Sequence, residues 1–191
     1  MEIRSFLAFE LPVKIKEIIS RASAEMKKLS LHVRWVRVDN IHLTVVFMGN
    51  ISEDDLGQIG EAVSKVCKRY GPFNISLNGS GIFGSRRNPR VLWIGLDGDL
   101  ERISYFRNSL QKHLKPFGIK EEKRRFKPHL TLGRFRKGTE SNVDLDDLLS
   151  TYQNITSPLC AVEELILFRS ELKPGGAVYS KVEAWPLIGS H

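Results

Sequence analysis

Two short segments of this chain repeat one another, and this internal repeat restricts the fold more than any other feature of the sequence. Residues Ile41–Val45 and Pro128–Leu132 share the pattern His-x-Thr-x, with His42 and His129 lying 87 positions apart. Each copy reads as a strand, and on a strand a residue shares its face with the residue two positions later. Each copy therefore presents one imidazole and one hydroxyl (Thr44 or Thr131) on one face. Two related lobes with these faces opposed across a cleft are the simplest arrangement.

The rest of the sequence interleaves helical and strand-like patterns. Apolar spacing predicts helices at 13–29, 56–70, 100–114 and 144–152, with Pro12 before the first and a capping box, Ser52 and Asp55, before the second. Strands are expected at 4–9, 35–38, 42–47, 73–77, 90–96, 129–132, 161–168 and 178–183. No segment is rich enough in Pro, Gly or Ser to divide the chain. We therefore expect an α+β fold, with residues 1–191 forming a single bilobal domain.

The glycines at positions 79, 81 and 84 match a dinucleotide-binding fingerprint in spacing alone. A strand is expected on both sides of them, whereas a nucleotide loop of this type leads into a helix. We interpret them as part of a connection between two strands.

Paired histidines on opposite sides of a cleft suit displacement at phosphorus. The attacking oxygen needs a base and the leaving oxygen needs an acid, and the imidazole pKa near neutrality serves both roles. Threonine hydroxyls can hold the non-bridging oxygens. The scheme needs no cofactor or metal, and the sequence has no metal-ligand spacing such as HExxH or CxxC. A single copy would be explained as well by an ordinary core histidine, but two of five histidines in matched contexts favour chemistry.

The balance of charge favours a phosphate-bearing partner. The chain has a net charge of +7 and a pI of about 9.5, which attracts polyanions without identifying one. No run reaches the roughly 18 apolar residues that span a bilayer, and the N-terminus leads directly into a predicted strand rather than a signal peptide. Two cysteines, Cys67 and Cys160, indicate free thiols in a reducing compartment. We expect a cytoplasmic protein without membrane contact.

At the two motifs the sequence resembles the two-histidine (2H) phosphoesterases, in particular the RNA 2′,3′-cyclic phosphodiesterases, also called 2′-5′ RNA ligases (LigT-like). The resemblance is carried by four stretches that follow the order and spacing of the family. They are RSFLAFELP from Arg4, WVRVDNIHLTVVFMGN from Trp35, RVLWIGLDG from Arg90 and FKPHLTLGRFRK from Phe126. Val45 departs from the leucine of many relatives, on the face that we expect to be buried.

The resemblance implies a bilobal α+β fold and a role for each motif residue. His42 would give a proton to the departing 3′ oxygen, and His129 would activate water, leaving a 2′-phosphomonoester. Thr44 and Thr131 would hold the phosphate oxygens. Arg134 matches an arginine that follows the second motif in the family and is a candidate phosphate contact.

Several alternatives remain open at this point. The basic cluster around Arg125, just before His129, is either an RNA-backbone contact or a solvated loop. If a 5′-hydroxyl attacks instead of water, the same residues make a 2′-5′ RNA ligase, with tRNA fragments among the conceivable substrates. A non-catalytic RNA-binding module is the alternative of a different class. Nothing in the sequence demands more than a monomer.

Overall fold

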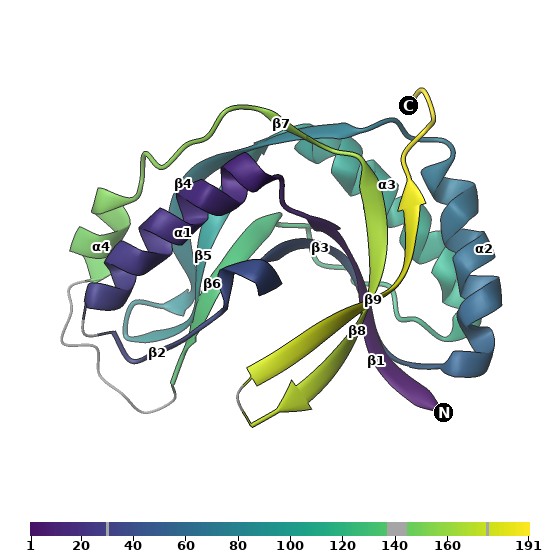
Figure 1. Cartoon of the computed structure of the whole chain (residues 1–191), viewed down its shortest axis with the longest axis horizontal. Helices are drawn as coiled ribbons and strands as arrows, with labels where there is room; N and C mark the ends of the chain where they lie inside the picture. The colour runs from purple at the N-terminus through teal and green to yellow at the C-terminus, as the bar shows by residue number, and fades with distance from the viewer. Residues whose placement is uncertain (30, 137–144, 175) are drawn as a thin grey trace.

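The computed structural model of the chain describes residues 1–29, 31–136, 145–174 and 176–191. It contains two curled antiparallel sheets with helices on their outer sides (Figure 1). The predicted α+β fold with two lobes of antiparallel strands is thereby confirmed.

The first sheet has the strand order β3-β1-β8-β9. Its central strand β1 is buried on both faces: Phe6 and Ala8 lie on the side of the cleft, and Leu7 and Phe9 lie on the side of the main core. This explains why the segment reads as a nearly continuous apolar run rather than as an alternating one. The strands of this sheet are β1 (Glu2–Glu10), β3 (His42–Ser52), β8 (Glu164–Lys173) and β9 (Gly176–Pro186).

The second sheet has the order β2-β6-β5-β4-β7. Its longest strand, β4, includes the three glycines that we expected in a connection, so that expectation was wrong. Gly79 and Gly84 have positive φ at irregularities in the pairing with β5, and a Cβ on Gly81 would overlap the ring of Trp93. The strands are β2 (Val33–Trp35), β4 (Phe73–Ser85), β5 (Asn88–Gly98), β6 (His129–Phe135) and β7 (Cys160–Val162).

In the described part of the chain, four α-helices cover the sheets, and each buries one face, as Ile15, Ile19 and Met26 do for the first helix. In Figure 1, α1 and α4 lie beside the five-stranded sheet, whereas α2 and α3 lie together beside the four-stranded one. The expected Asp144 at the start of the last helix lies outside the described residues. The helices are α1 (Val13–Lys28), α2 (Leu56–Cys67), α3 (Leu100–Leu114) and α4 (Leu145–Thr151), with 3-10 turns η1 (Val38–Asn40), η2 (Glu53–Asp55) and η3 (Lys115–Phe117).

Several details of the predicted elements differ in the structure. The strand expected at 161–168 is two strands, because β7 pairs in one sheet and β8 in the other, with only Glu163 between them. The strand expected at 35–38 ends at Trp35 and is followed by η1. Ser52 does not form the predicted capping box with Asp55; its hydroxyl instead accepts the Asp54 N–H and caps η2, which precedes α2. Among the described residues, none of the helices combines the length and apolarity needed to cross a membrane.

Candidate active site

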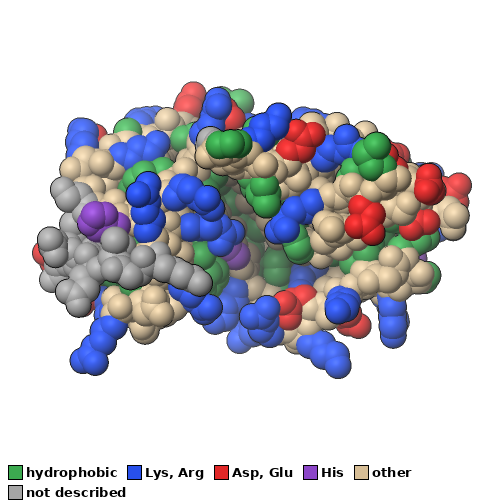
Figure 2. Space-filling model, turned by 90° about the horizontal axis from the view of Figure 1, so that it is seen from below, with side chains coloured by type: hydrophobic (Ala, Val, Ile, Leu, Met, Phe, Trp, Pro, Cys, Tyr) green, Lys and Arg blue, Asp and Glu red, His purple; other side chains and the backbone are tan. Residues whose placement is uncertain are grey.

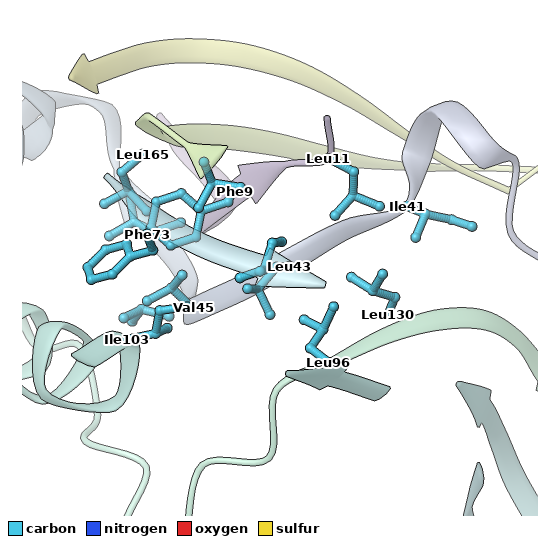
Figure 3. Close-up of a cluster of buried hydrophobic side chains, with 14 of the residues drawn as sticks. Phe9, Leu11, Ile41, Leu43, Val45, Phe73, Leu96, Ile103, Leu130 and Leu165 are labelled. Carbon is cyan, nitrogen blue, oxygen red and sulfur yellow. The ribbon is translucent and has the colours of Figure 1, made fainter. Parts of the chain in front are cut away.

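The two His-x-Thr segments begin two strands that meet between the sheets. His42 is the first residue of β3, at an edge of the first sheet, and His129 is the first residue of β6, and the two strands contact each other. The apolar residue between the His and the Thr of each motif points the other way, as predicted: Leu43 and Leu130 both point into one shared core cluster (Figure 3). The shared core fixes both strands from behind, so the histidines lie on their other faces.

Both imidazole rings are held by the same local hydrogen bond. His42 Nδ1 lies 2.8 Å from the carbonyl oxygen of Asn40, and His129 Nδ1 lies 2.7 Å from that of Lys127. A carbonyl only accepts, so Nδ1 carries the proton and donates it in both rings. In the neutral ring, Nε2 then holds the lone pair, and no described residue hydrogen-bonds to either Nε2. Each ring thus has one nitrogen available for proton transfer.

Aromatic side chains of the first sheet surround His42. Its ring stacks on Phe6, with centroids 4.6 Å apart, and is nearly perpendicular to the ring of Tyr179 at 5.3 Å; Phe168 is stacked at 6.1 Å. This burial lowers the pKa of His42 from its ordinary value of 6.5 to about 4, against the raising effect of the Asn40 hydrogen bond; the charge of His129 lowers it further. The His129 contribution places the two imidazoles within electrostatic reach of one another.

His129 has different neighbours. Its ring is perpendicular to that of Phe83, with centroids 4.7 Å apart, and Phe83 in turn packs against Trp93. Burial lowers the pKa of His129, the Lys127 carbonyl raises it, and the positive charge of Arg134 lowers it. In the free protein both histidines are therefore biased toward the neutral form.

The two threonines lie on the same faces as the histidines. Thr44 is opposite Ala8 in the first sheet, and Thr131 is opposite Trp93 in the second. Both are half-buried, and within the described part of the chain neither hydroxyl has a protein hydrogen-bond partner. Two such hydroxyls are available to a bound anion.

A small pocket of about 130 Å³ opens beside His42 and is lined in part by Phe168, Tyr179 and the ion pair of Glu10 with Lys181, whose Oε2 and Nζ are 2.7 Å apart. Figure 2 shows the molecule from below the view of Figure 1. At the centre of this face is a hollow with a histidine at its bottom and Lys and Arg side chains gathered around it. The site therefore joins proton-transfer groups, free hydroxyls and positive charge, a combination suited to a phosphate.

The candidate arginines are placed differently. Arg134 is exposed on β6, near enough to His129 to affect its pKa, and its register partner on β2 is Arg34, a second cation that the sequence analysis did not identify. Arg125 lines a separate groove along α3. Asn40 was also missed, although it stands two residues before His42; its side-chain Nδ2 donates to the Ala177 carbonyl at 3.0 Å and so ties η1 to β9.

Comparison with known proteins relates the whole chain to phosphoesterases, in agreement with a site suited to a phosphate. Two stretches, residues 9–93 and 94–179, each match the family described as LigT like Phosphoesterase. A protein of Methanothermobacter thermautotrophicus named RNA 2′,3′-cyclic phosphodiesterase is 34% identical over 98% of this chain and 100% of its own length.

Two solved structures share the fold over nearly their full lengths. A protein of Thermus thermophilus has a TM-score of 0.81 at 26% identity, covering 99% of this chain and 100% of its own. E. coli LigT complexed with 3′-AMP has a TM-score of 0.76 at 25% identity, covering 98% and 99%. The two matches to one family divide the sequence between the two motifs, one in each half. The chain belongs to the LigT-like phosphoesterase family.

Proposed function

We propose that this protein hydrolyses the 2′,3′-cyclic phosphate at the 3′ end of RNA and leaves a 2′-phosphomonoester. The observation that carries the proposal is the matched pair of histidines, each with Nδ1 bound to a main-chain carbonyl and with no partner for Nε2 among the described residues. The substrate class is supported by the full-length similarity to a protein named RNA 2′,3′-cyclic phosphodiesterase.

In this proposal the two histidines divide the proton transfers. Neutral His129 accepts a proton from water through Nε2, and the water oxygen forms a bond to phosphorus. The bond from phosphorus to the 3′ oxygen breaks on the opposite side, and protonated His42 gives its Nε2 proton to that oxygen. One water is consumed, and the product carries a 3′-hydroxyl and a 2′-phosphate. Thr44 and Thr131 hold the non-bridging oxygens, and Arg134 supplies positive charge beside them.

The low pKa of His42 fits the role of acid only when substrate is bound. In the free protein a pKa of about 4 leaves His42 neutral at physiological pH. A bound phosphate carries negative charge next to the ring, and an adjacent opposite charge raises the pKa of an imidazole. The substrate therefore helps to load the proton that its own leaving oxygen receives.

We also infer that residues 1–191 act as one catalytic domain, as a cytoplasmic monomer whose partner is RNA. The two sheets supply one histidine each, so neither half holds a complete site. Cys67 and Cys160 are both free thiols, in keeping with a reducing compartment. Light scattering of the purified protein tests the monomer, and a stable dimer would contradict it.

The test is turnover of a short RNA ending in a 2′,3′-cyclic phosphate, with EDTA present. We expect formation of a 2′-phosphate by the wild type and a loss of at least about 10³-fold in both His42→Ala and His129→Ala. His32→Ala, which alters an exposed histidine, is the matched control and is expected to keep full activity. Circular dichroism checks that each variant is folded.

Two other outcomes would overturn the proposal. RNA that binds to the wild type without being turned over indicates the non-catalytic binding module. When RNA with a 5′-hydroxyl end is added, a predominance of joined over hydrolysed product indicates a 2′-5′ ligase that uses the same histidines.

A further inference from the structure

A second and much larger hollow, which we call the α3 groove, lies along the outer side of α3. Its volume is about 1370 Å³, and it runs from Tyr70 past Tyr105 and Lys112 to the loop that ends at Pro128. His42 and His129, both within the described residues, do not line it. The volume exceeds the range of about 300–1,000 Å³ typical of small-molecule pockets, which favours a polymeric ligand.

The α3 groove is strongly basic. Seven Lys or Arg residues and three Glu residues line it, giving +4 with His113 neutral, out of +7 for the whole chain. Two of the three carboxylates are already engaged. Glu122 forms an ion pair with Arg124 at 2.8 Å, and hydrogen bonds from Arg124 lower the pKa of Glu122 to about 2. Glu101 accepts a hydrogen bond from the Tyr105 hydroxyl at 3.0 Å.

The lysines of the groove, by contrast, form no ion pairs within the described part of the chain. Lys112, Lys115 and Lys123 are exposed, and among the residues that the structure describes none of them has an acidic partner. Unpaired cations along a groove displace counterions from a phosphate backbone, which is the main source of affinity for nucleic acids. The exposed ring of Tyr105 adds a surface on which a base can stack.

The loop that lines the α3 groove leads directly into β6, the strand that begins with His129. Arg107, which is buried, donates from Nη2 to the Glu122 carbonyl at 3.1 Å, and its guanidinium lies 5.0 Å from the centre of the Phe126 ring. These contacts hold the loop against α3. The same loop supplies the Lys127 carbonyl that binds His129 Nδ1, and Pro128 lines the groove directly before His129.

We propose that the α3 groove binds the sugar–phosphate backbone of RNA upstream of the cyclic phosphate. The inference rests on the proposed function, because the catalytic site receives only the terminal phosphate and its nucleoside. The groove then distinguishes an RNA end from a free cyclic nucleotide, through charge and without reading sequence. Arg125, exposed in this groove, belongs to the backbone contact rather than to the phosphate that reacts.

The test compares two substrates and two charge-matched variants. Lys112→Glu with Lys123→Glu reverses charge in the α3 groove; Lys14→Glu with Lys27→Glu reverses the same charge on α1, beside the other sheet. For single-stranded RNA with a cyclic phosphate end, we expect kcat/KM of the groove variant to fall about tenfold below that of the control variant. For 2′,3′-cyclic AMP, we expect the two variants to agree within about twofold, because a mononucleotide does not reach the groove.

Salt dependence gives an independent readout. Loss of two phosphate contacts on a single strand should make the slope of log affinity against log salt shallower by about 1.4 in the groove variant. Equal kcat/KM for RNA in the two variants would overturn the proposal for the groove while leaving the hydrolysis of cyclic AMP intact. If the wild type turns over neither substrate, the proposed function fails. Fluorescence anisotropy of labelled RNA then still tests whether the α3 groove binds RNA. Binding by the groove variant that is tenfold weaker than binding by the control variant supports the proposal, and equal binding overturns it.

Discussion

His42 and His129 each donate Nδ1–H to the carbonyl two residues earlier, but the chain fixes those two carbonyls by different means. Asn40 belongs to the turn η1, and its side chain is hydrogen-bonded to β9. Lys127 has no such anchor among the described residues; it precedes Pro128, which restricts its backbone to extended conformations, and follows a loop held by Arg107. Both copies share the position of the carbonyl, and unrelated local sequences provide it.

The surroundings of the two rings differ as well. Three aromatic side chains enclose His42, whereas His129 contacts one aromatic ring, that of Phe83, and lies near the positive charge of Arg134. A buried, mostly apolar setting penalises the charged form strongly. The same motif therefore carries two histidines with unequal costs of protonation.

The largest effect is expected on stability in acid. The folded pKa of His42, about 4, lies below the unfolded value of 6.5, so its contribution is complete above pH 6.5 and is lost as the pH falls toward 4. The loss is about 3 kcal/mol. We expect His42→Gln to lose correspondingly less stability than the wild type between neutral pH and pH of about 4, measured by urea unfolding. Equal losses in the two proteins would show that His42 is not the residue responsible.

The threonines test whether both copies hold the phosphate. Removal of one hydroxyl that stabilises charge in the transition state costs on the order of 10²-fold in turnover. We expect Thr44→Val and Thr131→Val each to lower kcat for cyclic phosphate hydrolysis to about this extent, measured by steady-state kinetics. A loss in only one variant would assign the phosphate oxygens to a single copy and break the symmetry of the site.

Substitution of the two residues whose carbonyls bind the histidines, Asn40 and Lys127, is expected to have unequal effects on kcat. Asn40→Ala keeps the main-chain carbonyl but removes the hydrogen bond to Ala177, so the ring of His42 is less well positioned, and we expect kcat to fall about tenfold with KM unchanged. Lys127→Ala keeps its carbonyl and the following proline, and we expect less than a twofold change. Equal effects of the two substitutions on kcat would refute the distinction between the anchors.

The smallest effect is a shift along the pH axis. The bell-shaped pH profile of kcat/KM reports the free protein, and that of kcat reports the complex with substrate. Because the bound phosphate raises the pKa of both histidines, we expect the profile of kcat to lie about one pH unit higher. Parallel rate measurements across the acidic and neutral range give both curves. Coincident curves would mean that the phosphate does not approach the rings.

The sequence predicted the periodic parts of this molecule well. The alternation at Leu43 and Leu130 gave the correct faces of both motif strands, and the helical spacing of Ile15, Ile19 and Met26 gave the correct face of α1. These patterns are local, so a single sequence contains them.

What the sequence did not predict depends on pairing between distant segments. The apolar run at 161–168 gives no sign that β7 and β8 join different sheets, because their partners, β4 for β7 and β1 for β8, lie far away in the sequence. Gly81 resembles a loop residue until Trp93 is seen to pack over it. The hydrogen bond that anchors the Asn40 side chain to Ala177 spans 137 positions, and Tyr179 reaches His42 from the same distant strand, β9.

The position of β8 and β9 affects when the site is completed during synthesis. The sheet that carries His42 takes two of its four strands from the last 28 residues of the sequence, beginning at Glu164. Phe168 and Tyr179, which enclose His42, come from those strands. A chain emerging from the ribosome therefore contains His42 and His129 before β8 and β9, which complete the surroundings of His42, have been synthesised. A truncated chain that ends before β8 contains both histidines and Phe6 but lacks Phe168 and Tyr179, two of the three aromatic side chains that set the basicity of His42.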